Sequence, residues 1–431
     1  MIQALLLATL ALTQTPAPLA HELEQLVDLP STKERRAKAL ELAARKDNSL
    51  EDWLGAMQAF GTFEKPVAGF KTEKVPLLAD GKLEETELCL YIPTSYDPTK
   101  PAPLICAYHG TGGSGKEMAE MWRADAEKIG ALVLAPSEAG ANEGYAWSVR
   151  ERESALCALR WMRRHYDVDE RRIFATGISR GGHLAWDLVL RHPDLFAALA
   201  PQIGGPRLAI VRGQNNMRLL ENLVPIPIRD LQGSKDDEVL VESLHVAFAR
   251  LAKFGAQDAK LTEFPELGHS FEFDAVDWKT FLGAAQRPVE PEHVVRCSAR
   301  LDEARSFWIE ITAFEKTVEE EFQPIIPVNE WKALDAAGQR ARMLKEAEKR
   351  TARLELKREA PGRFAASGSG VAGFRLLLTQ EQLGPKNSVQ LKWQSKLLAP
   401  RTVVPDKAIA LGDFAERFDR TWIPVAECRV P

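Results

Sequence analysis

The chain has 431 residues, of which 45% are hydrophobic and 27% charged, and its formal net charge at pH 7 is −5. This is the composition of a globular protein that is long enough to form two or three domains with sizeable cores. Lys and Arg residues are scattered and in slight deficit, which argues against a nucleic acid as a partner.

The N-terminal segment, residues 1–20, has features of a secretory signal peptide. The sequence is MIQALLLATLALTQTPAPLA, and its apolar core from Ala4 to Leu12 is too short to span a bilayer. Cleavage is expected after Ala20, although Pro18 is unfavourable there and no Lys or Arg precedes the apolar core. The alternative is a buried first helix. No later apolar run approaches membrane-span length, so we expect no stable insertion into a membrane.

Residues 21–74 are predicted to be helical. The stretch STKERRAKALELAARKDNSLEDWLGAM has helical spacing and many charges. Ser31 is placed to cap a helix, with Glu34 at the capping-box position. We expect two helices here.

Residues 75–286 alternate between short apolar runs and amphipathic segments. The expected strands are ETELCLYIP, PLICAYHG, ALVLAP, RRIFATG, FAALAPQIG, PIPIRDLQG and AKLTEFP. The expected helices between them are KEMAEMWRADAEKIG, RESALCALRWMRRHY, GGHLAWDLVLRH and EVLVESLHVAFARLAKFG. This alternation predicts an α/β fold, in which a mostly parallel sheet is covered by helices on both faces. Active sites of such sheets lie at the carboxyl ends of the strands.

Residues 287–431 are predicted to form a small β-rich domain. They follow a proline-bearing linker, QRPVEPEH, and contain short alternating runs such as HVVRCSA, SFWIEIT, RLELKRE, GFRLLLT, SVQLKW and TWIPVAECRV. One charged helical insert is expected at residues 330–350. The pattern is typical of a β-sandwich with a helix.

The segment RRIFATGISRGGH places Ser179 between Gly177 and Gly181, at the junction of an expected strand and an expected helix. This matches the G-x-S-x-G nucleophile elbow, in which the flanking glycines remove side chains that would clash and the corner exposes the serine hydroxyl. The same corner lies at a helix N-terminus, which favours developing negative charge. The five-residue pattern alone is also compatible with an ordinary helix cap. Its strand and helix context favours a catalytic nucleophile.

A serine nucleophile needs a base, and an acid that orients that base. Of the eight histidines, His269 lies in a glycine-flanked loop just after the last expected strand of the α/β region. Three acids, Asp236, Asp237 and Glu238, follow the preceding strand. A tight turn after Gly233 would bring Asp236 back over the strand end toward His269, while Asp237 would turn outward to begin the helix.

The negative oxygen of an acyl-transfer intermediate needs two backbone donors. One expected donor is the N–H of Arg180, and the other comes from the loop HGTGG, where we favour Thr111. His109 of the same loop is expected to shape the substrate pocket. Tyr145 and Trp147, in a loop after another strand, are expected to line it with apolar faces.

Two other classes of protein compete with a serine hydrolase. The segment GTGGSGKE nearly fits a phosphate-binding loop, but Glu117 stands where a Mg²⁺-binding hydroxyl is expected and would repel phosphates. The second alternative is a binding protein built on an inactive hydrolase scaffold. The complete set of serine, acid and histidine argues against it. The five cysteines fit neither a disulfide framework nor a zinc site, and no metal or cofactor is expected.

The motifs YHGTGGSG, YDVDERRIFATGISRGGH, GSKDDEV and LGHSF resemble those of secreted bacterial α/β-hydrolases of the polyhydroxybutyrate-depolymerase and feruloyl-esterase type. The resemblance covers a little under half of the chain. It implies an α/β-hydrolase fold, an ester substrate that is small or polymeric, a triad of Ser179, Asp236 and His269, and an oxyanion hole formed by Thr111 and Arg180.

Prolyl-oligopeptidase-like peptidases share the pattern around the serine, so peptide hydrolysis is the alternative activity. Such peptidases usually carry a large β-propeller, for which the short helical segment at residues 21–74 leaves no room. Residues 287–431 are similar to a β-rich domain that trails some secreted bacterial hydrolases. We expect this domain to pack against the catalytic domain, and the alternative is that it binds a polymer surface. The oligomeric state is left open.

Overall fold

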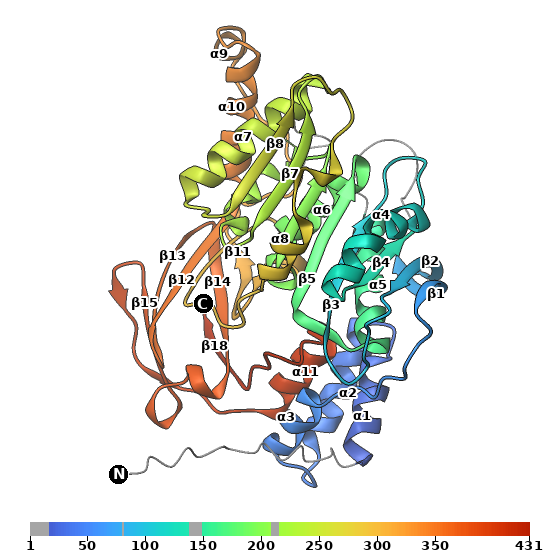
Figure 1. Ribbon diagram of the computed structural model, residues 1–431. Coiled ribbons are helices and arrows are strands. Elements are labelled where there is room, and N and C mark those ends of the chain that lie inside the picture. The colour runs from blue at the N-terminus through green and yellow to red at the C-terminus, as the bar shows by residue number, and fades with distance from the viewer. Residues whose placement is uncertain (1–16, 80–81, 138–148, 208–214) are drawn as a thin grey trace, which may run out of the picture.

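The computed structural model describes residues 17–79, 82–137, 149–207 and 215–431 (Figure 1). An eight-stranded sheet lies at its centre, with the strand order β1-β2-β4-β3-β5-β6-β7-β8. The strands are β1 (Gly69–Ala79), β2 (Lys82–Ile92), β3 (Ala102–Tyr108), β4 (Leu132–Pro136), β5 (Val168–Ile178), β6 (Ala198–Gln202), β7 (Ile228–Gly233) and β8 (Ala259–Phe264). β2 is antiparallel to both of its neighbours, and the strands from β4 to β8 are parallel.

Helices cover both faces of this sheet, as the sequence predicts. α4 (Gly115–Ile129) and α8 (Trp278–Ala284) pack on one face around Trp122, Trp278 and Phe281. α5 (Val149–His165), α6 (Arg180–Arg191) and α7 (Glu238–Phe254) pack on the other, around Trp186 and Leu244. The central strands are buried on both sides, which explains their continuous apolar sequences. Strand order, strand direction and covering helices together are those of an α/β-hydrolase fold. β1, an edge strand, was not among the predicted strands.

The chain after residue 287 forms two β-sheets that share one core. One has the order β10-β11-β14-β18, and the other has the order β16-β15-β13-β12-β9 with β17 paired to β15. The strands are β9 (His293–Ser298), β10 (Arg305–Ser306), β11 (Ile309–Phe314), β12 (Ala352–Ala360), β13 (Arg363–Ser369), β14 (Val371–Leu378), β15 (Ser388–Trp393), β16 (Lys396–Leu397), β17 (Arg401–Thr402) and β18 (Ala426–Val430). The predicted helical insert is present as α9 (Val328–Lys332) and α10 (Ala336–Lys349), which project beside α7 in Figure 1.

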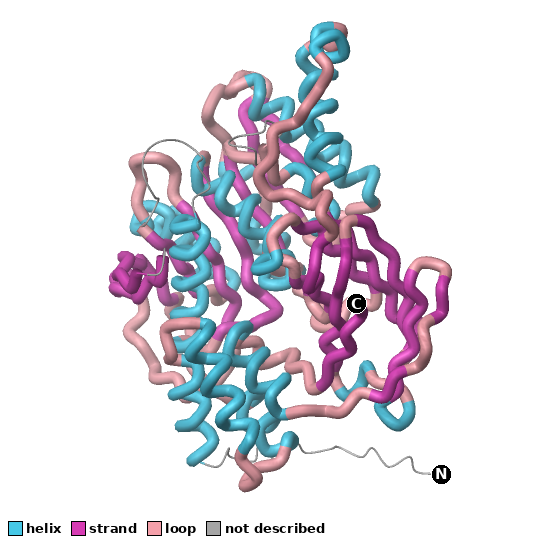
Figure 2. The backbone as a smooth tube through the Cα atoms, turned by 180° about the vertical axis from the view of Figure 1, so that it is seen from behind, coloured by secondary structure: helices cyan, strands magenta, loops and turns pink. Residues whose placement is uncertain are grey.

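A third core joins the two ends of the described chain. α1 (Ala17–Val27), α2 (Thr32–Ala44) and α3 (Leu50–Gln58) pack with α11 (Lys407–Arg417), so segments far apart in sequence lie side by side in Figures 1 and 2. The expected capping box of Ser31 and Glu34 begins α2. α11 was not predicted: the sequence pattern suggested one helix in the β-rich region, at residues 330–350. α1 spans the expected cleavage point after Ala20, and Leu19 is buried in this helical core. The apolar run from Ala4 to Leu12, on which the signal peptide and its alternative of a buried first helix both depend, lies outside the described residues.

The three cores meet along a seam of buried arginines. Arg163 of α5 donates to the carbonyl oxygens of Arg417 and Phe418, at 2.9 and 2.6 Å, and so satisfies the C-terminal end of α11. Arg287, in the predicted linker, donates to Asp419 at 2.7 Å. Burial alone would raise the pKa of Asp419, but the guanidinium groups of Arg287 and Arg163 outweigh it and hold that pKa at about 2. The linker is therefore part of the packed structure.

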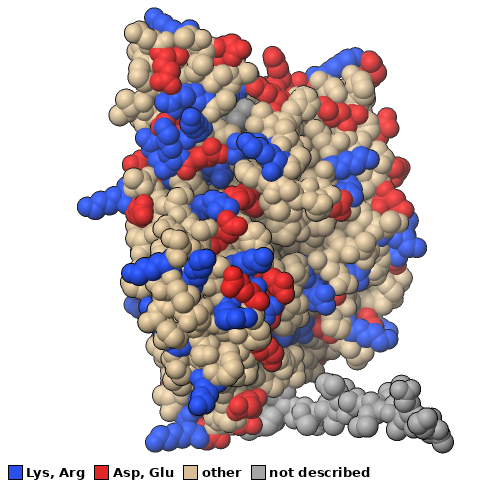
Figure 3. Space-filling model, turned by 90° about the vertical axis from the view of Figure 1, so that its left-hand side faces the viewer, with Lys and Arg blue, Asp and Glu red and all other residues tan. Residues whose placement is uncertain are grey.

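The surface carries charges of both signs. On the face shown in Figure 3, Lys and Arg side chains alternate with Asp and Glu side chains over the β-rich region and the projecting helices. A nucleic-acid phosphate backbone favours a basic stripe or patch. This face has the mixed pattern that the scattered charges of the sequence predict.

Candidate active site

Ser179 occupies a strained corner between β5 and α6. Its φ of 54° and ψ of −115° lie in a region that a residue with a side chain rarely adopts. A Cβ atom added to Gly177 would lie 2.3 Å from the carbonyl oxygen of Gly181, and one added to Gly181 would lie 1.9 Å from that of Tyr108. Only glycine fits at either position. The Ser179 N–H donates to the carbonyl oxygen of Gln202 at 2.8 Å, which ties the corner to the end of β6.

His269 lies beside this corner, in the loop after β8. Its Nε2 is 2.8 Å from Ser179 Oγ, and its Nδ1 is 2.8 Å from Asp236 Oδ2. The loops after β7 and β8 touch closely, because a Cβ atom added to Gly233 would lie 1.9 Å from the carbonyl oxygen of Gly268. The His269 side chain is 50% exposed. A serine hydroxyl, an imidazole and a carboxylate thus form one hydrogen-bonded chain that opens to solvent.

In the loop after β7, Asp236 and Asp237 make different contacts. Asp236 Oδ2 faces His269, and Asp236 Oδ1 accepts the N–H of Asp237 at 2.7 Å. Asp237 instead caps α7, because its side chain accepts the N–H groups of Val239 and Leu240 at 3.1 Å each. This is the register that the tight turn after Gly233 predicts.

The Asp236 carboxyl has a pKa below its usual range. Burial alone would raise that pKa, but hydrogen bonds from Asp237, His269 and Gln232 outweigh it. Asp236 therefore stays ionised at neutral pH and can hold the Nδ1 proton of His269.

The two predicted oxyanion donors, the N–H groups of Arg180 and Thr111, lie in segments next to Ser179. Arg180 is the first residue of α6, so its N–H has no intrahelical acceptor and lies at the positive end of the helix dipole. The loop that contains Thr111 passes close by, since a Cβ atom added to Gly110 would lie 3.5 Å from Ser179 Cβ. Within the described part of the chain the Thr111 N–H has no hydrogen-bond partner. Both predicted oxyanion donors are thus at the same end of the sheet as the serine.

The side chains of two predicted site residues have structural partners. His109 is buried, with Nδ1 2.8 Å from the carbonyl oxygen of Gly110 and Nε2 3.0 Å from that of Ser137. The ring nitrogens therefore connect this loop to the one after β4, and the expected role of His109 in shaping the substrate pocket stays a prediction. The buried Arg180 guanidinium donates Nε to Glu151 at 2.9 Å, which links the corner to the start of α5.

Tyr145 and Trp147, expected to line the pocket, lie outside the described residues. Three contacts of the site residues were absent from the sequence-based set: the side chains of Gln232 and Glu151, and the main-chain carbonyl of Gln202. Both glutamines are polar residues near the carboxyl ends of their strands, ALAPQ and IRDLQG, and that position is the signal that could have pointed to them. Nothing in the local sequence around Glu151 indicates its partner, because the two residues of that ion pair are 29 positions apart.

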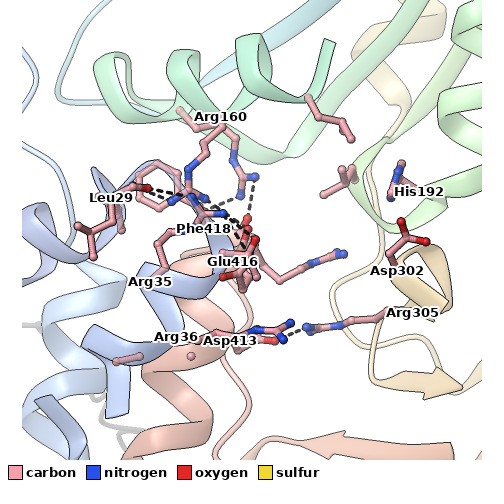
Figure 4. Close-up of a pocket in the computed structure, with 18 of the residues that line it drawn as sticks. Leu29, Arg35, Arg36, Arg160, His192, Asp302, Arg305, Asp413, Glu416 and Phe418 are labelled. Atoms are coloured by element: carbon pink, nitrogen blue, oxygen red, sulfur yellow. Dashed lines mark hydrogen bonds and ion pairs between the residues drawn. The ribbon is translucent and has the colours of Figure 1, made fainter. Parts of the chain in front are cut away.

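A large cavity lies elsewhere in the molecule. It has a volume of about 1540 Å³ and is lined by residues of α2, α5, α11 and the β-rich region (Figure 4). Its charged side chains are largely matched to one another, as in the pairs Arg305–Asp413 and Arg35–Glu416. None of Ser179, His269 and Asp236 lines it. Cavity size alone therefore does not identify the reactive site.

Two other kinds of site find no support in the described ranges. Within them no group of His, Cys, Asp and Glu side chains is arranged to hold a metal ion, and no helix has the length and hydropathy needed to span a membrane. In the segment that resembles a phosphate-binding loop, the Glu117 carboxylate accepts the N–H of Ser114 at 2.8 Å. The N-terminus of α4 is thus capped by its own carboxylate, where a nucleotide phosphate would have to bind.

Comparison with known proteins gives partial matches. No family model matches the chain. Part of the chain is similar to feruloyl esterase C of Emericella nidulans, with 32% identity over 167 residues, which cover 35% of this chain and 60% of that protein. Part is similar to poly(3-hydroxyalkanoate) depolymerase C of Paucimonas lemoignei, with 28% identity over 117 residues, which cover 24% of this chain and 28% of that protein. The chain therefore spans less than two thirds of the length of these relatives.

Solved structures also match in part. A thermostable esterase has 22% identity and a TM-score of 0.41, with 50% of this chain and 63% of that chain covered. A ferulic acid esterase from Anaeromyces mucronatus has 14% identity and a TM-score of 0.39, with 52% and 93% covered. Superpositions at this level add nothing to the fold assignment, which rests on the strand order itself.

Proposed function

We propose that the protein is a serine hydrolase that cleaves carboxylic esters through an acyl-enzyme intermediate. The observation that carries this proposal is the hydrogen-bonded chain from Ser179 through His269 to Asp236, at 2.8 Å for each step. It starts at a serine in the strained corner that a nucleophile requires. It ends at a carboxylate whose pKa is lowered.

In the first half of the reaction, neutral His269 accepts the Ser179 proton while Oγ attacks the ester carbonyl carbon. Asp236 fixes the tautomer of the imidazole and stabilises the imidazolium that forms. The N–H groups of Arg180 and Thr111 stabilise the negative oxygen of the tetrahedral intermediate. The intermediate then collapses, the imidazolium protonates the leaving alcohol, and the acyl group stays on Ser179.

In the second half, water replaces the alcohol. His269 accepts a proton from water as it attacks the acyl-enzyme, and returns that proton to Ser179 Oγ when the carboxylic acid leaves. Because the base must be neutral, we expect turnover to decline on the acid side of neutrality, where histidine ordinarily becomes protonated near pH ~6.5.

One observation favours esters over peptides, and a second concerns access to the reacting atoms. The curated relatives reported above are named as a feruloyl esterase and a poly(3-hydroxyalkanoate) depolymerase, both of which act on ester bonds by their names. The half-exposed imidazole of His269 leaves the reacting atoms accessible. We therefore propose an aryl or polymeric ester as the substrate.

A substrate panel tests this proposal. Purified protein is assayed with nitrophenyl esters, feruloyl esters, a short polyester and a set of peptide anilides, with the Ser179→Ala variant as the control. We expect hydrolysis of esters by the unmodified protein only. Cleavage of anilides at a higher kcat/KM than esters would favour the peptidase alternative, and ester hydrolysis that persists in the variant would contradict the assignment of Ser179.

Export from the cytoplasm is a second, independent proposal, supported by the apolar segment within residues 1–20. N-terminal sequencing of the protein secreted by its host, or recovered from the periplasm, tests it. A mature chain that begins at His21 is expected. Retention of Met1 would contradict cleavage, and α1 would then keep its first turn, which begins at Ala17.

A further inference from the structure

We propose that Gln232 is a positioning residue for Asp236, an inference that rests on the proposed ester hydrolysis. Gln232 lies on β7, immediately before Gly233, and is fully buried. Its Nε2 donates to Asp236 Oδ2 at 2.7 Å and to the carbonyl oxygen of Gly233 at 3.1 Å. The oxygen that accepts from Gln232 is the one that faces His269.

The orientation of this amide is fixed by its surroundings. Nε2 faces two acceptors, and the reverse orientation would place the amide oxygen against a carboxylate and a carbonyl oxygen. In the described structure Gln232 Oε1 is buried and has no hydrogen-bond partner. Such an orphaned acceptor is costly, and an apolar side chain on this buried strand would avoid the cost. The N–H directed at Asp236 is the compensating interaction.

The contacts of Asp236 show what this N–H does. The Asp237 N–H holds Oδ1, and the Gln232 amide holds Oδ2, so the carboxylate is fixed at both oxygens before it meets the imidazole. A carboxylate held in this way keeps one orientation toward Nδ1 of His269. The Gln232 donor also disperses charge from Oδ2, which weakens the pull of the carboxylate on a protonated imidazole. Gln232 thus acts on the reaction through Asp236, without touching the substrate.

Gln202 provides a matched control on the neighbouring strand. It lies at the carboxyl end of β6 and is also fully buried. Its side chain donates to Thr176 Oγ1 and to the carbonyl oxygen of Ala200, at 3.3 and 2.5 Å, and makes no hydrogen bond to the side chains of Ser179, His269 or Asp236. Loss of either amide removes buried hydrogen bonds, but only loss of the Gln232 amide removes one from Asp236.

The experiment compares Gln232→Met, Gln232→Leu and Gln202→Met by kcat, KM and the pH dependence of kcat/KM on one activated ester. For both Gln232 variants we expect kcat to fall about tenfold, the scale of one hydrogen bond to a charged group, with KM unchanged. We also expect the midpoint of the acid limb to move up by about 0.5 pH unit, because the less solvated carboxylate favours the protonated imidazole.

For Gln202→Met we expect a lower melting temperature and an acid limb with the midpoint of the unmodified protein. The inference is overturned if both Gln232 variants keep the original midpoint, because a role in packing alone lowers activity without moving it. If one variant fails to fold, the other decides, since Met and Leu differ in shape but both lack the N–H. Failure of the proposed function has a different signature: no ester turnover by the unmodified protein, or turnover that survives Ser179→Ala.

Discussion

The reactive edge of the sheet and the buried seam between the three cores both concentrate polar groups, but they use them differently. In the seam, Arg163 and Arg287 are buried donors that meet carbonyl or carboxylate oxygens from another core. At the reactive edge, the chain of hydrogen bonds ends at a half-exposed imidazole and a strained serine. Donors and acceptors that are fully paired with one another stabilise the contact between the cores. A chain of hydrogen bonds that ends at an exposed side chain leaves groups available to a substrate.

The difference shows which features locate a reactive site in this protein. The cavity of about 1540 Å³ is bordered by the seam and carries many ionisable groups, yet those groups largely satisfy one another. The corner at Ser179 combines an unfavourable backbone conformation with two nearby backbone N–H groups, those of Arg180 and Thr111, that have no hydrogen-bond partner in the described part of the chain. Strain and unpaired donors, rather than cavity volume or charge density, distinguish it.

The largest expected effect comes from Ser179→Ala at the reactive edge. We expect kcat for ester hydrolysis to fall by roughly 10⁶-fold, as for other serine nucleophiles, with the unfolding midpoint in urea unchanged. The hydroxyl contributes to the reaction, while its contacts do not join the cores. Parallel kinetics and urea unfolding measure both quantities. A large loss of stability would mean that the corner also serves as a structural joint.

The second effect separates two adjacent acids. Asp236→Asn removes the carboxylate that holds Nδ1 of His269, and we expect kcat to fall about 10⁴-fold with little change in KM. Asp237→Asn, the matched control, disturbs only the cap of α7 and costs about 1 kcal/mol in the free energy of unfolding. The values of kcat and KM for both variants on one activated ester show which of the two acids orients His269. Inactivation by Asp237→Asn alone would contradict the roles given to these residues.

The third effect is expected in the seam, where a substitution should lower stability and leave activity unchanged. Arg163→Met leaves two carbonyl oxygens at the end of α11 without their donor and removes the nearer of the two arginines paired with the buried Glu170. We expect a loss of about 3–5 kcal/mol in the free energy of unfolding, with kcat/KM unchanged at temperatures where the variant is folded. Arg123→Met, at an exposed ion pair, is the control and should change stability little. If Arg163→Met lowered kcat in a fully folded variant, seam and reactive edge would be coupled.

The smallest effect concerns pH and involves both regions. Burial lowers the pKa of His183, beside the reactive edge, and of His192, beside the cavity, to about 4 each. In the unfolded chain histidine titrates near ~6.5, so between about pH 6.5 and pH 4 the unfolded state binds more protons and the free energy of unfolding falls as pH drops. The loss is of the order of 3 kcal/mol per histidine once the pH has fallen through the whole window.

Urea unfolding at several pH values measures this dependence. His192→Gln is expected to reduce the loss of stability between pH 7 and pH 5, while the exposed His245 provides a control through His245→Gln. An unchanged pH dependence in His192→Gln would show that His192 does not titrate in this window.

The sequence predicted the central architecture because local periodicity carries it. Seven of the strands in the sheet, β2 to β8, and the helices α4 to α7 appear as apolar runs and amphipathic segments in the expected order. The candidate reactive residues could also be predicted from the sequence, because a glycine pattern indicates Ser179 and the tight turn after Gly233 indicates Asp236. Edge strand β1 was not predicted, because its sequence GFKTEKVPLLA contains lysines and a proline and so resembles a loop.

What the sequence could not predict depends on partners far away in the chain. α11 packs on α2, and Thr32 donates to Glu416 across 384 residues, so its helical state depends on a distant segment. The same holds for Arg163, whose acceptors at the end of α11 lie more than 250 positions away. The hydrogen bonds of the His109 side chain could not be predicted for a similar reason: one of its partners, the carbonyl of Ser137, comes from the loop after β4.

The most direct test of the central claim is covalent labelling of the folded protein with a nitrophenyl alkyl phosphonate, followed by peptide mapping by mass spectrometry. An activated serine attacks the phosphorus, releases nitrophenolate and keeps the phosphonyl group. We predict one adduct per chain, on Ser179, with loss of ester hydrolysis in proportion to labelling and no adduct on the Ser179→Ala variant. An adduct on another serine, or ester turnover that persists in fully labelled protein, would contradict the account.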